Sequence, residues 1–171
     1  MTAKLVGVVV LATLLRGQVK SPEPLTVCKV LSNLSLYRGQ RICVRGELVG
    51  GEEGSALIGE GCQPLVTDGY RWSSPSPIAL TYPESPSVKD SKSPTPTVRV
   101  ERMDPDALKE AGPGAKVYVT VIGRLDTRVH FEMVLRGDSK VVPYGYGHQA
   151  ACPAQLVYEE IKDFVVVPAK R

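Results

Sequence analysis

The stretch Arg41–Leu48, which reads RICVRGEL, decides the fold. Successive side chains of an extended chain point to opposite faces. One face of this segment therefore carries Ile42, Val44, Gly46 and Leu48, and the other carries Arg41, Cys43, Arg45 and Glu47. This alternation predicts a half-buried strand. The glycine-rich turn at 50–54 and the segment 55–59 that follows predict its hairpin partner.

The sequence on either side of this hairpin predicts two helices and further strands. Residues 26–36 place apolar side chains at helical spacing, with Thr26 as the N-cap. Asp104 and Pro105 mark the start of a second short helix, which ends at Ala111, before Gly112. The remaining runs predict a third strand at 78–82, a fourth at 117–125, an additional strand at 131–135, a loop at 143–151 and a last strand at 154–167.

The order of these elements predicts a mainly β fold. Five short strands with a helix between the third and the fourth follow the order of a small five-stranded Greek-key barrel of the OB (oligonucleotide- and oligosaccharide-binding) type. Gly46 and Gly123 lie late in their strands and would allow the bends that barrel closure requires. With 16 glycines, 14 prolines and 6% aromatic residues, the composition suits a turn-rich β domain, which we place at residues 26–167.

A segment rich in proline and serine interrupts the predicted barrel. Six prolines and seven serines lie within residues 73–97. Proline lacks the amide donor that a regular sheet needs, so we expect an extended surface loop at 83–97.

Two parts of the chain resemble a known group of proteins. Residues 26–31 and then 36–46, which read LYRGQRICVRG, resemble the opening of small exported bacterial OB-fold-like proteins, where a helix precedes the pattern Y-x-G-K-x-V-x-V-x-G. The tripeptide at 146–148 and the segment 153–157 are similar to the Y-G-H loop and last strand of that group. The resemblance implies the fold and export. The group is largely uncharacterised and the motifs are structural, so no activity is implied.

The N-terminus has the pattern of an export signal. A short segment carrying Lys4 precedes Leu5–Leu15, an apolar run of eleven residues. Such a run is shorter than the roughly 20 residues of a membrane span but suits the core of a signal peptide. We therefore expect a signal peptide at residues 1–20, a periplasmic or extracellular protein, and no stable membrane span after leader removal. The alternative is a cytosolic protein in which 6–14 is a buried first strand.

The net positive charge of the chain resides in this leader. Three of the 21 basic residues lie in the first twenty positions, which leaves 18 basic residues against 18 acidic ones. Nucleic-acid binding requires local positive charge. The overall charge of +3 is therefore no evidence for a nucleic-acid partner.

The chain has four cysteines, at positions 28, 43, 62 and 152. Their spacing contains no C-x-x-C and matches no zinc-finger pattern, so two disulfides are expected in an oxidising compartment. If Leu48 pairs with Ser55 in the hairpin, Cys62 falls beside the end of the first helix, which predicts a Cys28–Cys62 bond. The remaining pair, Cys43–Cys152, would join the first strand to the start of the last. In a cytosol all four would be small core residues.

No catalytic or cofactor motif is present in the sequence. A Walker loop, G-x-G-x-x-G, H-E-x-x-H and G-x-S-x-G are all absent. His148 and Cys152 are four residues apart, which leaves a thiol enzyme as a distant alternative. A disulfide-bonded sulfur cannot act as a nucleophile, and two ligands do not complete a zinc site. We therefore expect a non-catalytic protein without metal or cofactor.

The remaining candidate site is a surface that combines cations with aromatic rings. OB barrels bind polymers on their sheet face through such residues. The candidate ligand-binding residues are Arg41, Arg45, Arg124, Tyr144, Tyr146 and His148. The simpler interpretation is solvated arginines and tyrosines packed in a turn. We expect an exported, non-catalytic barrel with a binding or structural role in the envelope and an unknown partner. The alternative is an OB module that binds single-stranded nucleic acid or an anionic oligosaccharide as a weak anionic ligand.

Overall fold

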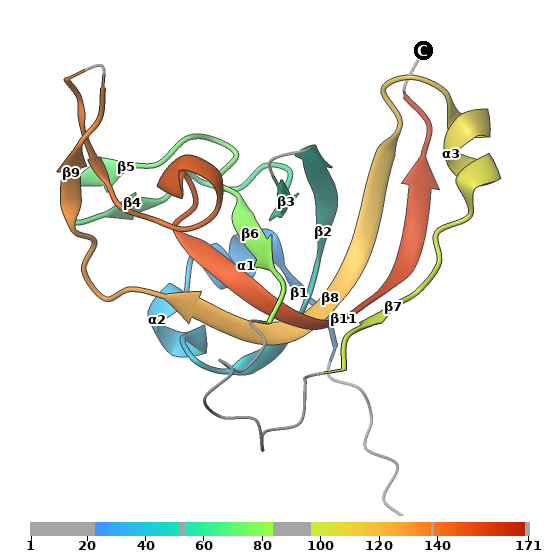
Figure 1. The fold of residues 1–171 in the computed structure, drawn as a ribbon, viewed down its shortest axis with the longest axis horizontal. Helices are drawn as coiled ribbons and strands as arrows, with labels where there is room; N and C mark the ends of the chain where they lie inside the picture. Colours follow the sequence, from blue (N-terminus) through green and yellow to red (C-terminus); the bar gives the residue numbers. More distant parts are fainter. Residues whose placement is uncertain (1–22, 52–53, 84–96, 138, 170–171) are drawn as a thin grey trace, which may run out of the picture.

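Five strands close into a barrel (Figure 1). The computed structural model describes residues 23–51, 54–83, 97–137 and 139–169. The barrel strands are β2 (Arg41–Gly51), β3 (Gly54–Ile58), β6 (Ile78–Thr81), β8 (Lys116–Thr127) and β11 (Ala154–Val167). They pair in the circuit β2-β3-β6-β11-β8-β2, in which the β6–β11 pair is parallel and the other pairs are antiparallel. This is the Greek-key topology of an OB barrel.

The helix before the fourth barrel strand confirms the predicted order. It is α3 (Pro105–Ala111), and Asp104 caps it by accepting a hydrogen bond from the backbone N–H of Asp106 at 3.0 Å. Pro105 occupies the first helical turn, where its missing N–H costs no hydrogen bond. The prediction of a mainly β, OB-like barrel with a short helix before the fourth strand is confirmed.

The predicted N-terminal helix is broken in two. It forms α1 (Val27–Leu31) and α2 (Leu34–Tyr37), preceded by β1 (Leu25–Thr26), which pairs parallel with β2. The hydroxyl of Thr26 accepts a hydrogen bond from the N–H of Lys29 at 3.2 Å, as expected of an N-cap. Ser32 and Asn33 then donate side-chain hydrogen bonds to the carbonyl of Lys29 at 3.1 and 3.0 Å. Such bonds compete with the helical backbone, which explains why the helix ends.

The hairpin register differs by two residues from the predicted one. Leu48 pairs with Leu57, not with Ser55, because Gly51 and Gly54 already pair and two residues join the strands. The predicted turn was longer. A shift of two residues keeps every side chain on its own face of the sheet, so the predicted core face is unchanged.

The core fills the barrel and the space beneath α1. A Cβ at Gly46 would lie 2.7 Å from Cγ2 of Val27, so the glycine lets α1 pack directly on β2. A Cβ at Gly123 would lie 2.4 Å from the carbonyl oxygen of Val157, beside the register shift in β11. Both glycines thus permit close packing at the barrel wall. The buried core consists of Val27, Val30, Leu31, Ile42, Val44, Leu57, Ile78, Val119, Val121, Leu125, Ala154, Leu156 and Ile161.

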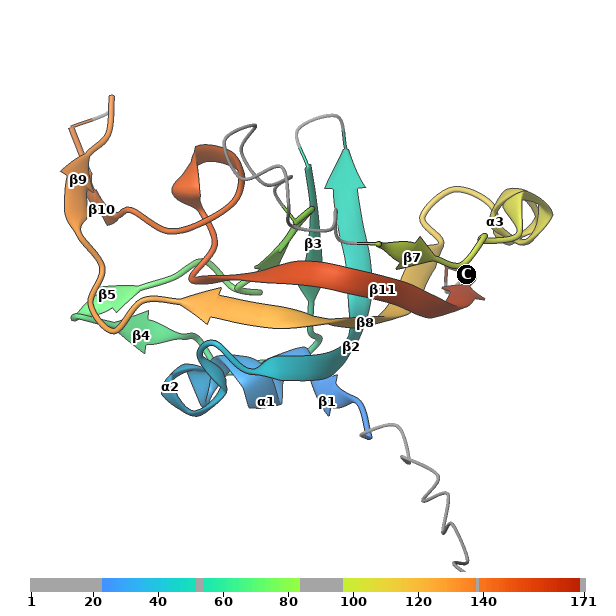
Figure 2. The ribbon, with the colours of Figure 1, turned by 60° about the horizontal axis from the view of Figure 1, so that its bottom comes forward.

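The connections between barrel strands carry small elements that the sequence mostly did not predict. They are β4 (Val66–Thr67), β5 (Tyr70–Arg71), β7 (Arg99–Val100), β9 (Met133–Leu135), β10 (Val141–Pro143) and a 3-10 helix, His148–Ala150. The β9–β10 hairpin and α3 lie at opposite ends of the molecule in Figures 1 and 2. The connection from β8 to β11 therefore forms one end, and it contains most of the candidate aromatic residues.

One of the two predicted disulfides is present. Cys28 in α1 is bonded to Cys62, across a sequence separation of 34 residues. The predicted Cys43–Cys152 bond is wrong, because both thiols are free and buried. Cys43 is the cross-strand partner of Ile122 in β8, and Ile122 is the cross-strand partner of Glu160 in β11. Glu160 lies eight residues after Cys152 in the chain. Eight residues of extended chain, at about 3.3 Å each, cover roughly 26 Å, so the two cysteines lie far apart along the sheet.

Two sequence predictions fall outside the described residues. The leader predicted at 1–20 does so entirely, and the loop predicted at 83–97 does so at residues 84–96. Within the described ranges, no helix combines the length and the apolar character that crossing a membrane requires.

Candidate functional site

A cleft of about 780 Å³ opens over β3 and β6. Three segments far apart in the sequence line it: the β2–β3 hairpin, the start of β6 and the segment that precedes β11. The lining residues are Val49, Gly50, Gly54, Ser55, Ala56, Pro77, Ala79, Leu80, Gly147, His148 and Cys152. The cleft thus lies over the second and third barrel strands, β3 and β6, between the β2–β3 hairpin and the segment that precedes β11.

Small side chains form the floor of the cleft. Ala56 and Ala79 are cross-strand partners in the β3–β6 pair. The adjacent pair, Leu57 and Ile78, points to the opposite face and is fully buried in the core. Because successive residues of a strand alternate in direction, the two alanines face away from the core. Ala79 is 3% exposed and lies beneath Gly147, whereas Ala56 is half-buried, so a bound molecule can approach the sheet closely at Ala56.

Two glycines let the segment 144–152 fold back over β6 and form a wall of the cleft. Tyr146 and Cys152 exchange backbone hydrogen bonds of 2.8 and 3.0 Å, which closes the segment into a loop. A Cβ at Gly145 would lie 2.2 Å from the carbonyl oxygen of Cys152, and one at Gly147 would lie 3.0 Å from Cβ of Ala79. Gly147 also has a φ of 69°, a conformation that glycine adopts without strain. The wall therefore depends on glycine at both positions.

Arg128 holds this wall to the end of β8. Its guanidinium carbon lies 5.1 Å from the ring centre of Tyr144 and 5.2 Å from that of Tyr146. The guanidinium also donates a hydrogen bond to the carbonyl of Tyr144 at 2.7 Å. Cation–π contacts of this kind contribute about 0.5–1 kcal/mol each at exposed sites. Arg128, which was not among the predicted site residues, is therefore a positioning residue for the cleft wall.

Cys152 brings a thiol to the cleft, but this thiol is a poor nucleophile. The residue is 7% exposed, and burial raises its pKa to about 11 despite a hydrogen bond with the backbone of Ala79. The thiol is therefore protonated at neutral pH, whereas the thiolate is the nucleophilic form. Burial raises the pKa of the Cys43 thiol as well. His148 is exposed on the same wall of the cleft.

The three predicted arginines lie on the outer face of β2 and β8 and do not line the cleft over β3 and β6. Arg41 and Arg124 are cross-strand partners. Nε of Arg41 is 2.7 Å from the carboxylate of Glu159, Arg124 contacts Asp126, and Arg45 donates to a threonine hydroxyl of β8 at 3.3 Å. This face carries both signs of charge, with Arg124, Asp126 and Glu159 lining a cleft of about 560 Å³.

Tyr144 and Tyr146 line a third cleft, of about 610 Å³, together with Arg128 and Arg136. Both arginines donate hydrogen bonds to carbonyl oxygens of the 144–150 segment itself. The six predicted ligand-binding residues are therefore divided among three surfaces, and His148 alone of the six lines the cleft over β3 and β6.

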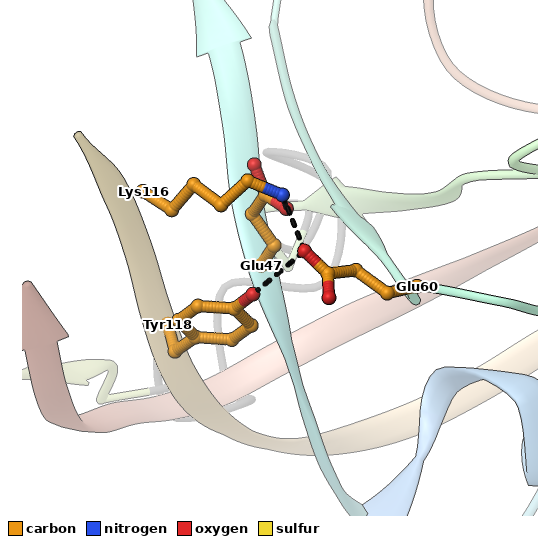
Figure 3. A network of polar contacts seen from close by, with 4 residues as sticks. All are labelled: Glu47, Glu60, Lys116 and Tyr118. Atoms are coloured by element: carbon orange, nitrogen blue, oxygen red, sulfur yellow. Dashed lines mark hydrogen bonds and ion pairs between the residues drawn. The ribbon is translucent and has the colours of Figure 1, made fainter. Parts of the chain in front are cut away.

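A polar cluster joins β2, β8 and the turn after β3 (Figure 3). Nζ of Lys116 is 3.0 Å from the carboxylate of Glu47 and also contacts Glu60, to which the hydroxyl of Tyr118 donates at 3.2 Å. Hydrogen bonds with Glu60 and Glu47 raise the pKa of Lys116, while burial and Glu60 raise that of Tyr118. Neither group acts as a base at neutral pH. The cluster instead fastens the turn that leads to Cys62.

Comparison with known proteins finds no match: no family model, no curated protein and no solved structure matches the chain. In the described part of the chain, no three His, Cys, Asp or Glu side chains gather where they could hold a metal ion. Function is therefore inferred from the position and the chemistry of the clefts.

The residues that define the main cleft gave almost no signal in the sequence. Ala56, Ala79 and Pro77 are ordinary residues of short strands and turns. The one available hint was the Gly-Tyr-Gly-His sequence at 145–148, because repeated glycines beside aromatic residues indicate a tight, specific loop.

Proposed function

We propose that this chain is an exported, non-catalytic OB-like binding domain whose ligand occupies the cleft over β3 and β6. One observation carries the proposal, namely the position of the cleft on the barrel. OB folds bind their ligands on the face of the second and third strands, between the connections that join strands one to two and four to five. Here those strands are β3 and β6, and the connections are the β2–β3 turn and the segment 128–153.

The chemistry of the cleft favours this function over binding of single-stranded nucleic acid or an anionic oligosaccharide. Binding of those polymers relies on cations and stacking aromatic rings. None of the described residues that line the cleft is Lys, Arg, Phe, Tyr or Trp. The arginines of the two other clefts are engaged with carboxylates or with the protein's own carbonyl groups.

Two further features support a non-catalytic, exported domain. The protonated Cys152 thiol argues against a thiol enzyme. The Cys28–Cys62 disulfide is typical of oxidising compartments, in agreement with the leader expected at residues 1–20. Together with the resemblance of residues 26–62 and 116–164, these features support the proposal that the chain is one of the small exported bacterial OB-like proteins.

The experiment uses the uncharged dye Nile red, whose emission shifts to the blue in an apolar site. We expect the protein to bind the dye, and Ala56→Trp to weaken binding at least about tenfold, because the indole would fill the floor of the cleft. Ala56 faces away from the core, so the variant should keep the circular dichroism spectrum of the parent protein.

The control variant is Leu135→Ser, because Leu135 on β9 is an exposed apolar residue (72%) outside the cleft. It should leave dye binding unchanged. Absence of dye binding, or binding that depends on Leu135 and not on Ala56, would refute the assignment of the site. Retention of the protein on heparin or on single-stranded DNA at low salt, lost in Arg128→Ala, would favour the polyanion-binding alternative.

A further inference from the structure

We infer that β9 pairs edge to edge with the β9 of a second copy of this chain, antiparallel and about a two-fold axis at Val134. This surface lies at the end of the molecule opposite α3, and the inference does not depend on the cleft over β3 and β6. Three features support it: the open edge of β9, the apolar side chains beside that edge and the self-complementary sequence of residues 132–136.

The outer edge of β9 is open for pairing. The N–H of Arg136 donates to the carbonyl of Lys140 at 2.9 Å, so the even-numbered residues of β9 are the ones that bond to β10. In an antiparallel ladder the backbone groups of alternate residues point to opposite edges, so those of Met133 and Leu135 point away from β10. Among the described strands, only β10 pairs with β9.

The edge of β10 is less suited to pairing than the edge of β9. By the same alternation, Val141 and Pro143 direct their backbone groups away from β9. Pro143 has no N–H to donate, and proline is one of the residues that protect strand edges from pairing. Pairing through β9 alone makes a closed dimer and not a longer assembly.

Apolar side chains beside the open edge favour its coverage by another strand. Leu135 is the cross-strand partner of Val141, and Met133 lies two residues before Leu135, so all three share one face of the hairpin. Met133, Leu135 and Val141 are 42%, 72% and 57% exposed. An exposed apolar edge strand is a template for pairing with another chain, and a two-stranded sheet is marginally stable until further strands join it.

The sequence of residues 132–136, EMVLR, is complementary to itself and therefore indicates a second copy as the partner. With Val134 opposite Val134 of the second copy, Glu132 lies opposite Arg136. Met133 then lies opposite Leu135, and each pair occurs twice. Opposite-charge and apolar cross-strand pairs stabilise a sheet. The register also agrees with the backbone, because Met133 and Leu135 are the residues whose outward N–H and C=O groups would exchange hydrogen bonds. A shift by two residues separates each glutamate from its arginine.

Sedimentation velocity over a series of concentrations tests the pairing. Two short strands form a small interface, so we expect a weak, reversible dimer and nothing larger. Glu132→Arg should weaken dimerisation at least about tenfold, because it places like charges opposite each other twice. The double variant Glu132→Arg with Arg136→Glu reverses both signs and should return the dimerisation constant to within about threefold of the parent value.

The double variant separates pairing between copies from a structural role of Arg136. Within one chain Arg136 bonds to the carbonyl of Gln149, a contact that Arg136→Glu removes and that Glu132→Arg cannot replace. Residues 132 and 136 are four apart along one extended chain, too far for a direct ion pair. Recovery of dimerisation in the double variant is therefore expected only if the two charges meet across copies.

Single cysteines test the register. Val134→Cys should form an intermolecular disulfide on mild oxidation, because residues that face each other at the axis have Cα atoms about 4.5 Å apart. Leu135→Cys is the matched control. Position 135 is the more exposed, yet its counterpart in the second copy lies diagonally, about 7–8 Å away and beyond the reach of a disulfide. The parent, whose two free thiols are buried, should not cross-link.

Three results would overturn the inference. They are a protein that stays monomeric at every concentration, a double variant that does not regain the dimerisation lost in Glu132→Arg, and cross-linking of Leu135→Cys as readily as Val134→Cys. Because none of these measurements involves Nile red or Ala56, the dimer and the proposed function of the cleft stand or fall separately.

Discussion

Removal of the Cys28–Cys62 bond by the double substitution Cys28→Ser and Cys62→Ser should destabilise the barrel markedly. The bond closes a loop with a sequence separation of 34 residues, and the chain-entropy relation assigns about 3.8 kcal/mol at 25 °C to a loop of that length. For a domain of this size, about 3.8 kcal/mol corresponds to a fall in Tm of roughly 8–15 °C. Both cysteines are half-buried, so serine hydroxyls at these positions can reach water and add little cost of their own.

The assay is urea denaturation of parent and variant proteins, each with and without a phosphine reductant. Reductant should lower the midpoint of the parent protein toward that of the variant and leave the variant unchanged, because Cys43 and Cys152 are already thiols. Thiol titration of the denatured, unreduced parent should find two thiols. Four thiols, or a parent midpoint that does not respond to reductant, would refute the bond, and no thiols would restore the predicted Cys43–Cys152 bond.

Two other perturbations test the barrel and its end connection. Gly123→Ala should cost about 2–3 kcal/mol in urea denaturation, because its Cβ would lie 2.4 Å from a backbone oxygen, whereas Gly137→Ala, with no atom within 4 Å, should stay within about 0.5 kcal/mol of the parent. Asp68 accepts hydrogen bonds from Nδ1 of His130 at 3.0 Å and from the N–H of Phe131 at 2.9 Å, and these bonds lower its pKa below 3.8. A lowered pKa in the folded state means that its stabilisation is complete above pH 3.8 and is lost as the pH falls through the folded-state pKa. The urea midpoints of the parent and of Asp68→Asn should therefore converge between pH 5 and pH 2, and a constant gap would contradict this role of the carboxylate.

The fold could be predicted from the sequence because its deciding signals are local and repeated. The alternation in Arg41–Leu48 and the β-branched and aromatic residues of 154–167 each specify a strand without information from other segments, and β11 has the bounds 154–167. Asp104 and Pro105 specify the start of α3 in the same way. The order of elements then leaves few topologies, of which the OB barrel is one.

The details that could not be predicted depend on competition between local choices. Ser32 and Asn33 are tolerated in a helix, and nothing in the pattern of apolar residues reveals that their side chains bond back to Lys29. The length of the hairpin turn likewise depends on which residues form the last cross-strand pair, which is Gly51 with Gly54. The same uncertainty affects the disulfides. The Cys28–Cys62 bond tolerates the two-residue difference in hairpin register, whereas Cys43–Cys152 required the relative stagger of two strands that β8 separates.

Tyr144 and Tyr146 do not line the cleft over β3 and β6, for a chemical reason that concerns Arg128. A cluster of tyrosines and arginines in a sequence has the same composition whether the rings stack on a ligand or on a cation of the protein. Here Arg128 stacks on Tyr144 and Tyr146 and bonds to the carbonyl of Tyr144, so these groups build a wall instead of contacting the cleft that the wall encloses. Because Arg128 and the two tyrosine rings belong to the wall, the cleft is lined by other residues, which include Ala56, Ala79 and the buried Cys152. The tyrosine and arginine side chains that suggested an anionic polymer therefore build the wall, and none of the described residues that line the adjacent cleft is Lys, Arg, Phe, Tyr or Trp.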